Sequence, residues 1–347
     1  MKQGRTLEEL ARELDRQNVA KSDLIASTRK LDMLDNGMLN VMGEGTLELL
    51  PLAHQQIGAR VGIPTKYYNR MAEEAPGLLS HNVNYWFENN PESRMLRLMD
   101  NKVRAFLSDR YRRRDNFDLM SWVLPTLRDI GGLQVTSCEV TEQKLYLKCT
   151  TPRVSTDVRQ GDTVQAGLVI SNSEVGLGAF KVQPMILRLV CMNGMISNVY
   201  GMSKYHVGKR ITVEDEVQQL FSDETIEADD QAFYLKCRDI VKGALSDETF
   251  MMIVQQLMEA TDTPIKLKPV ETVERLSKRF TLTKNEGDSV LANLLRENDL
   301  TMYGLSNAVT ATAKEDELTY DRATELEELG GNIITLNPTE WRELAVA

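Results

Sequence analysis

Hydrophobic and polar residues alternate through the middle of the chain, between about residues 93 and 200. A period of two is typical of β-strands that bury one face. A helix over residues 116–130, with apolar residues at helical spacing, separates an early hairpin from the later strands. Those later strands are predicted over residues 133–140, 144–149, 162–171 and 179–190. The sequence therefore predicts an α+β fold with an antiparallel sheet core in a hairpin-helix-hairpin arrangement.

The early hairpin is predicted for the segment from Ser93 to Arg114, with Asp100 and Asn101 as a two-residue turn. This turn places Arg97 directly opposite Arg104 on one face of the ribbon. Like charges in that position destabilise a strand pair, so an anion is expected between or near them. Two sources of this anion remain open: acidic side chains from elsewhere in the fold, or the phosphate backbone of a nucleic acid.

Helical patterns flank this core on both sides. Thr6 and Glu9 have the spacing of a capping box that begins a helix, and two short helices are predicted over about residues 49–61 and 64–75. Residues 20–45 show no clear period. After residue 211, apolar residues again recur at helical spacing. The predicted organisation is a helical N-terminal region (1–92), an antiparallel α+β core (93–210) and a helical C-terminal region (211–347).

Charge is unevenly distributed along the 347 residues, whose formal net charge is −10. Residues 1–211 contain 28 Lys/Arg and 23 Asp/Glu, whereas residues 212–347 contain 13 Lys/Arg and 28 Asp/Glu. The hairpin segment alone carries seven arginines and one lysine against two aspartates. A polyanion would be attracted to the first part of the chain and repelled by the acidic second part.

Cysteine and histidine spacing gives no sign of a metal site. The four cysteines contain no CxxC pair, and the three histidines are scattered singly. There is no signal-peptide pattern and no apolar run long enough to span a bilayer. We therefore expect a cytoplasmic protein with no cofactor and no metal, in which Cys149 and Cys237 are small buried residues in a reducing environment.

Motifs of the common catalytic classes are missing from the sequence. There is no GxxxxGK[ST] phosphate loop, no HExxH and no GxSxG. Gly176 and Gly178 form a GxG with no third glycine, which we interpret as a tight turn or bulge between strands. An enzyme acting on nucleic acid would need a metal site, and sequence spacing does not bring its carboxylates together. The acidic residues near predicted strand ends are Asp109, Asp115, Asp162 and Glu174.

Several segments resemble one known family. The runs VRAFLSDRYRRRDNFDL (103–119) and GDTVQAGLVISNSEVGLGAFKVQPMILRLVCMNGMI (161–196) are similar to the phage/plasmid-like domain-of-unknown-function family numbered 932. GIPTKYYNRM, HNVNYW, YGLSNAVTATA and TELEELGGNII resemble the same family. The resemblance implies a cytoplasmic protein of a phage, plasmid or integrated element in a bacterial host, and it brings no reaction with it. The predicted core is also similar in architecture, not in sequence, to single-strand-annealing proteins.

We predict a homo-oligomeric protein of a phage or mobile element that binds single-stranded DNA, with strand annealing as an extension of that activity. One alternative is an interaction protein that uses its acidic C-terminal region to bind a host defence component. Another is that the arginines are structural, with their heads paired to carboxylates. The predicted phosphate-binding and base-stacking residues are Arg97, Lys102, Arg104, Phe106, Arg110, Tyr111, Arg112, Arg113, Arg114, Lys144, Tyr146, Lys148, Lys204, Lys209 and Arg210.

Overall fold

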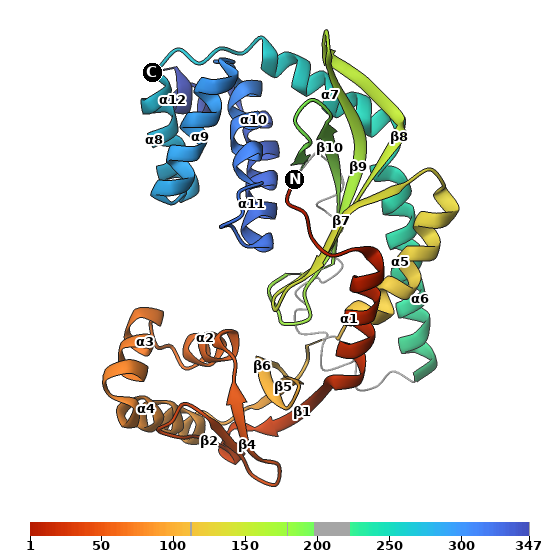
Figure 1. Cartoon of the computed structure of the whole chain (residues 1–347). Coiled ribbons are helices and arrows are strands. Elements are labelled where there is room, and N and C mark those ends of the chain that lie inside the picture. Colours follow the sequence, from red (N-terminus) through yellow and green to blue (C-terminus); the bar gives the residue numbers. More distant parts are fainter. Residues whose placement is uncertain (112, 179, 198–222, 347) are drawn as a thin grey trace. The chain divides into compact units, whose positions relative to one another are not determined.

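The computed structural model describes residues 1–111, 113–178, 180–197 and 223–346 (Figure 1). The chain divides into two compact units, each described by itself. Unit 1 comprises Met1–Leu10, Met120–Asn172 and Ala179–Ala347, and unit 2 comprises Ala11–Leu119 and Ser173–Gly178. Helices and strands both build the fold, which confirms the α+β class. The predicted boundary after residue 92 falls inside unit 2, and the one after residue 210 lies outside the described residues.

Unit 1 contains a five-stranded antiparallel sheet with the order β11-β10-β9-β8-β7. Each of the four later strand segments predicted from alternation contains a strand. Pro184 lies inside β10 and does not interrupt it, and Asn193 and Gly194, whose residue types favour turns, begin a strand. The strands are β7 (Gln134–Val140), β8 (Leu145–Arg159), β9 (Asp162–Asn172), β10 (Lys181–Arg188) and β11 (Asn193–Ile196).

Helices pack against this sheet around one hydrophobic core. Val164 and Ile186 of the sheet and Leu257, Leu305 and Leu326 of the helices are among its buried members. Within unit 1, α10 and α11 contact β11, and α6 contacts β10. The helices are α5 (Asn116–Ile130, which begins in unit 2), α6 (Asp223–Ala244), α7 (Asp247–Thr261), α8 (Pro269–Phe280), α9 (Lys284–Glu297), α10 (Met302–Thr312), α11 (Tyr320–Ile334) and α12 (Pro338–Ala345).

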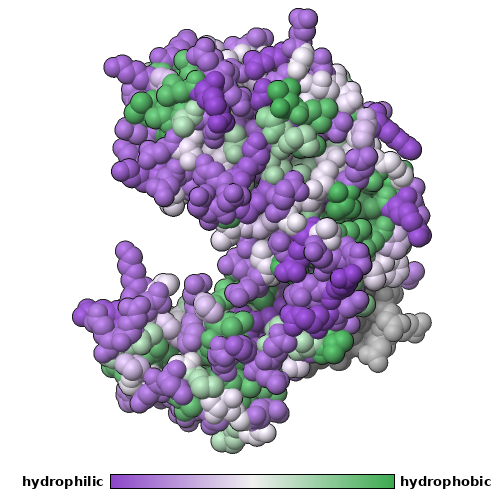
Figure 2. Space-filling view, in the orientation of Figure 1, coloured by the Kyte–Doolittle hydropathy of each residue, from purple (hydrophilic) through white to green (hydrophobic). Residues whose placement is uncertain are grey.

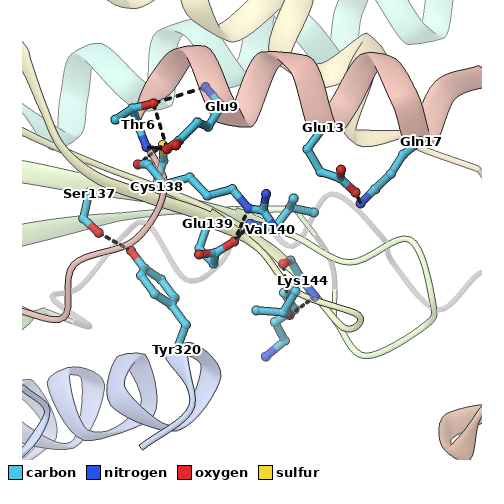
Figure 3. A network of polar contacts seen from close by, with 12 residues as sticks. Thr6, Glu9, Glu13, Gln17, Ser137, Cys138, Glu139, Val140, Lys144 and Tyr320 are labelled. Atoms are coloured by element: carbon cyan, nitrogen blue, oxygen red, sulfur yellow. Dashed lines mark hydrogen bonds and ion pairs between the residues drawn. The ribbon is translucent and has the colours of Figure 1, made fainter. Parts of the chain in front are cut away.

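The start of α1 (Leu7–Ala20) and the glycine pair of α11 show how far local sequence patterns determine helix ends. The capping box is confirmed: Thr6 N donates to Glu9 Oε2 (2.8 Å) and Glu9 N donates to Thr6 Oγ1 (3.2 Å) at the start of α1 (Figure 3). The pair Gly330 and Gly331 is a pattern that would be expected to end a helix, but α11 continues through it to Ile334. A side chain at either glycine would collide with α10 or β11, so these glycines permit close packing and do not stop the helix.

Unit 2 contains a six-stranded sheet with the order β1-β5-β6-β4-β3-β2, in which only β4 and β6 pair in parallel among the described strands. The core between sheet and helices includes Ile57, Tyr68, Val83, Leu96 and Phe106. The strands are β1 (Lys21–Ser27), β2 (Leu31–Met33), β3 (Leu39–Val41), β4 (Gly45–Leu49), β5 (Ser93–Met99) and β6 (Lys102–Ser108), and the helices are α2 (Pro51–Arg60), α3 (Thr65–Glu74) and α4 (Pro76–Asn89).

The strands β1, β2 and β3 of unit 2 are not predicted from the sequence, and two of them are very short. The stretch of residues 20–45 contains β1, β2 and β3, and the last two are three residues long. Three residues are too few to establish a period of two. Pro76 follows the end of α3 at Glu74 and is also the first residue of α4, a position where its missing N–H has no cost.

The arginine-rich hairpin of β5 and β6 forms as predicted at its turn but not in its register. Asp100 and Asn101 both have positive φ (51° and 60°), as a two-residue hairpin turn requires. Arg97, however, pairs with Ala105, and the register shifts between Arg97 and Leu98. Arg104 is therefore the extra residue of a bulge, and the prediction that it faces Arg97 is wrong. The bulge takes two like charges out of direct opposition.

Hydrophilic side chains cover most of the face seen in Figure 2, and apolar side chains form separate patches on it. Scattered exposed apolar residues of this kind are normal on a folded protein. Among the described helices, none combines the length and apolarity that a membrane span requires.

Candidate functional site

Arg97 is the centre of a buried ion network in unit 2. Its fully buried side chain donates from Nε to Asp23 Oδ1 (2.8 Å), from Nη2 to Asp115 Oδ1 (2.7 Å) and from Nη1 to the carbonyl oxygen of Glu174 (3.0 Å). The anion that the hairpin required therefore comes from the protein itself. The expectation that Arg97 contacts phosphate is corrected, because its guanidinium is buried and its charge is already compensated.

Arg104 is neutralised within the same network. It forms an ion pair with Glu174, whose other oxygen accepts a hydrogen bond from Asn116 N (2.5 Å). Lys21 Nζ binds Asp115 Oδ2 (2.6 Å). Unit 2 as a whole contains 16 Lys/Arg and 16 Asp/Glu. The positive charge of the arginine-rich segment is thus balanced by acidic residues of the same unit. The expectation that Arg104 contacts phosphate is wrong, because Arg104 is paired with Glu174.

The segment Ser173–Gly178 carries Glu174 into this network. Val175 packs with Met95, Ala105 and Leu107 of the hairpin in one buried cluster. Gly176 has a φ of 80°, which favours glycine. The GxG therefore forms a bend that fastens this segment to the hairpin, in agreement with its interpretation as a turn.

The network predicts a loss of stability in acid. Burial alone would raise the pKa of Asp115, but the charge of Arg97 and hydrogen bonds from Lys21 and Arg97 outweigh it and hold the pKa below its ordinary value of 3.8. At acidic pH the unfolded chain therefore binds a proton at Asp115 that the folded chain does not bind. The contribution of Asp115 is therefore present above about pH 4 and is lost as the pH falls below it. Urea unfolding at pH 7, 5, 4 and 3 should show this loss.

Asp115→Asn is the matched control for that pH series. It removes the titrating group, so its free energy of unfolding should be lower than that of the wild type at pH 7, and the gap should narrow toward pH 3. A gap that stays constant across the series would contradict the pKa assignment.

The other predicted residues of the hairpin are mostly engaged. Lys102 Nζ binds Glu48 (2.8 Å) at the surface. Phe106 is buried and stacks on Phe87 with ring centroids 5.9 Å apart, so its expected role as a base-stacking surface is wrong. Tyr111 is partly buried, and its hydroxyl donates to the carbonyl oxygen of Ser173 (3.0 Å). Burial raises the pKa of Tyr111.

Two cations of the segment between β6 and α5 remain at the surface of unit 2. Arg110 is exposed, and no described residue pairs with its guanidinium. Arg113 has a side chain that is 59% exposed, with a single long contact to Asp23 Oδ2 (3.3 Å). Arg114 is partly buried and has partners, and Arg112 lies outside the described residues. Arg110 and Arg113 are therefore the predicted arginines that the structure leaves able to bind an external anion.

Lys148 of β8 lies in a second buried network, within unit 1. Its Nζ donates to Glu327 Oε2 (2.5 Å) and to Thr324 Oγ1 (3.1 Å) on α11 and lies 4.7 Å from the ring centre of Tyr320. The side chains of Lys148 and Glu327 are fully buried. The expected role of Lys148 in phosphate binding is wrong, because α11 covers this face of the strand and supplies the counter-ion.

The neighbouring aromatic residue is covered in the same way. Tyr146 is buried, and its hydroxyl donates to Asp321 Oδ1 (2.9 Å), so it is no stacking surface. Ser137 and Tyr320 share a hydrogen bond of 2.7 Å between their hydroxyls (Figure 3). Lys144, in the turn before β8, is partly exposed. The predicted residues Lys204, Lys209 and Arg210 lie outside the described residues.

The acidic residues considered for a metal site are distributed over both units. Asp162 belongs to unit 1, where Arg188 binds it through Nε (2.7 Å) and Nη2 (2.9 Å). Asp115 and Glu174 serve the arginine network of unit 2. Across the described residues, no group of three or more His, Cys, Asp or Glu side chains is placed to hold a metal ion.

A family model described as "Domain of unknown function (DUF932)" matches residues 106–329, which is more than half of the chain. The chain belongs to this family. No curated protein and no solved structure matches it. The DUF932 match includes Lys148 and Glu327 of the unit 1 network and Asp115 and Glu174 of the unit 2 network, whereas Arg97 on β5 lies before it.

One residue of this DUF932 protein was missed by the sequence analysis although it belongs to the hairpin. Arg94 lies on β5, at the same alternation as Leu96 and Leu98. Leu96 and Leu98 belong to the hydrophobic core of unit 2. A lone arginine in the apolar row of an alternating strand is a signal that could have been recognised. Its side chain is 13% exposed and makes no hydrogen bond with any described residue.

Proposed function

We propose that this protein binds single-stranded nucleic acid through cations on the surface of unit 2. The observation that carries the proposal is that Arg110 and Arg113 remain exposed in the segment between β6 and α5, whereas Arg97 and Arg104 of the hairpin are engaged by carboxylates. Exposed arginines bind phosphate by charge and by paired hydrogen bonds. The hairpin face predicted from the sequence is replaced in this proposal by the segment that follows it.

Exposed aromatic side chains of the same unit support a preference for single strands. Tyr67 of α3 and Tyr85 and Trp86 of α4 are exposed, and the rings of Tyr85 and Trp86 pack edge to face with centroids 5.3 Å apart. Bases of a single strand can stack on such rings, whereas the bases of a duplex are already stacked. These residues take the place of the buried Phe106 and Tyr146 in the proposal. Strand annealing and homo-oligomerisation stay predictions from the sequence.

The test is binding of the purified protein to a fluorescent single-stranded oligonucleotide and to the matching duplex over a salt series. We expect binding that favours the single strand and weakens as salt rises, since each neutralised phosphate contributes a slope of about −0.7 in log K against log salt. The double variant Arg110→Gln/Arg113→Gln should bind more weakly and lower the magnitude of this slope by roughly 1 to 1.5.

Arg238→Gln is the control for the loss of positive charge. Arg238 is an exposed arginine of α6 in unit 1, with Asp239 as its partner. This variant should bind like the wild type. If the wild type does not bind the oligonucleotide even at low salt, the proposed function is wrong, and binding that is equal in the wild type and the double variant would exclude Arg110 and Arg113 as its carriers.

A further inference from the structure

Arg94 differs from Arg97, Arg104 and Arg188 in having no hydrogen-bonded counter-ion among the described residues. Arg97 has Asp23 and Asp115, Arg104 has Glu174, and Arg188 has Asp162 and Glu297. Arg94 approaches only Glu92, with Nε 3.8 Å from Oε1, which is beyond hydrogen-bond distance. Its Nε is buried without a partner. An unpaired buried donor is unfavourable for folding and therefore calls for an explanation.

The nearest carboxylate is already occupied. Arg60 donates to both oxygens of Glu92, from Nε to Oε1 and from Nη2 to Oε2, so the charge of Glu92 is already compensated. Asp109, the other acidic residue whose charge acts on Arg94, accepts a hydrogen bond from Ser108 Oγ (3.3 Å). The charged groups that act on Arg94 are therefore the basic Arg60 and the acidic Glu92 and Asp109, and no acidic group in this set forms a hydrogen bond with the Arg94 guanidinium.

The guanidinium of Arg94 is also held in place. Its Cζ lies 4.9 Å from the ring centre of Phe106, which packs on Phe87 in the core of unit 2. Since only Nε is buried without a partner, the terminal nitrogens reach solvent. An arginine supported by an aromatic ring and fixed in a half-buried position loses little further freedom when it binds an anion.

From these contacts we propose that Arg94 is the core of a phosphate-binding site on unit 2. Its two terminal nitrogens form a planar fork that matches two oxygens of a phosphate group. The phosphate can come from a nucleic-acid backbone, in which case this inference rests on the proposed function, or from a free phosphate ion. The same chemistry serves both sources, and the test separates them.

The first measurement is thermal unfolding of the full chain in sodium phosphate and in sodium chloride at equal ionic strength. A ligand that binds only the folded state raises the Tm. We expect a saturable rise of the wild-type Tm in phosphate, no such rise for Arg94→Met and a partial rise for Arg94→Lys, which keeps the charge without the fork. In chloride, the Tm of Arg94→Met should equal or exceed that of the wild type, because the variant removes an unpaired donor.

The second measurement is binding of the single-stranded oligonucleotide by the same proteins. Arg94→Met should weaken it by roughly tenfold, the effect of one charged hydrogen-bonded contact, and a rise in Tm without oligonucleotide binding would identify free phosphate as the source. Arg16→Met, which removes a surface arginine of α1 in unit 2, should leave both readouts near the wild type.

The outcomes separate this inference from the proposed function. A phosphate response that Arg94→Met abolishes, in a protein that binds no oligonucleotide, would support the site and reject the proposed function. Oligonucleotide binding that needs Arg110 and Arg113 but not Arg94, with no rise of the Tm in phosphate, would support the proposed function and reject the phosphate site at Arg94. A lower Tm of Arg94→Met in chloride, with both ligand responses intact, would overturn the phosphate site and show that Arg94 is structural.

Discussion

Replacing Lys148 with methionine should lower the free energy of unfolding by about 3–5 kcal/mol, the cost of leaving a buried charge without its partner. The side chains of Lys148 and Glu327 are fully buried, and Glu327 Oε1 already lacks a hydrogen-bond partner among the described residues. The variant would leave the whole carboxylate uncompensated against β8. Urea unfolding, with hydrogen exchange of β8 and α11 as a local readout, should show the loss in unit 1.

Two further variants make this result specific. Lys148→Met/Glu327→Leu removes both charges and fills the space with apolar atoms, so it should recover most of the loss, because a well-packed apolar pair can replace a buried ion pair. Lys144→Met removes a partly exposed lysine of the preceding turn and should change stability by less than about 0.5 kcal/mol. If Lys148→Met is as mild as Lys144→Met, the buried pair is not a stabilising element.

This pair illustrates what the sequence could predict of the sheet in unit 1. Alternation correctly places a strand around Tyr146 and Lys148 and separates their face from that of Leu145 and Leu147. It treats the polar face as open to solvent, because it contains no information about what lies across it. The covering carboxylate belongs to Glu327, which is 179 residues away in the chain. Periodicity is a local property, whereas the compensation of a buried charge is a long-range one.

The hairpin of unit 2 shows the same limit with a different cause. Local chemistry was sufficient for its turn, since Asp100 and Asn101 tolerate positive φ. The predicted pairing of Arg97 with Arg104 is wrong because a bulge adds one residue to β6, and alternation cannot locate a bulge. Local charge predicts an anion near Arg97 but leaves open whether a carboxylate or a phosphate supplies it. Only the fold shows that Asp23 and Asp115 are that anion.

Arg97→Met should lower the free energy of unfolding by about 3 kcal/mol, as expected when one member of a buried ion network is removed. Among the described residues, Arg113 would remain as the basic partner of Asp23, and Lys21 as that of Asp115. Arg97→Lys should recover little of the loss, since an ammonium group cannot reproduce the hydrogen bonds that the planar guanidinium makes to Asp23, Asp115 and the backbone of Glu174 in different directions. Urea unfolding, with hydrogen exchange of β5 and β6, measures the effect in unit 2.

The same variant separates a structural arginine from one that binds ligand. Arg16→Met, which removes a surface ion pair of unit 2, should cost less than about 1 kcal/mol. At a temperature where Arg97→Met is still folded, its affinity for the oligonucleotide, corrected for the folded fraction, should equal that of the wild type. Arg97 donates its hydrogen bonds to Asp23, Asp115 and the backbone of Glu174, so we assign it a structural role. A fall in affinity for the oligonucleotide without a fall in stability would contradict that structural role.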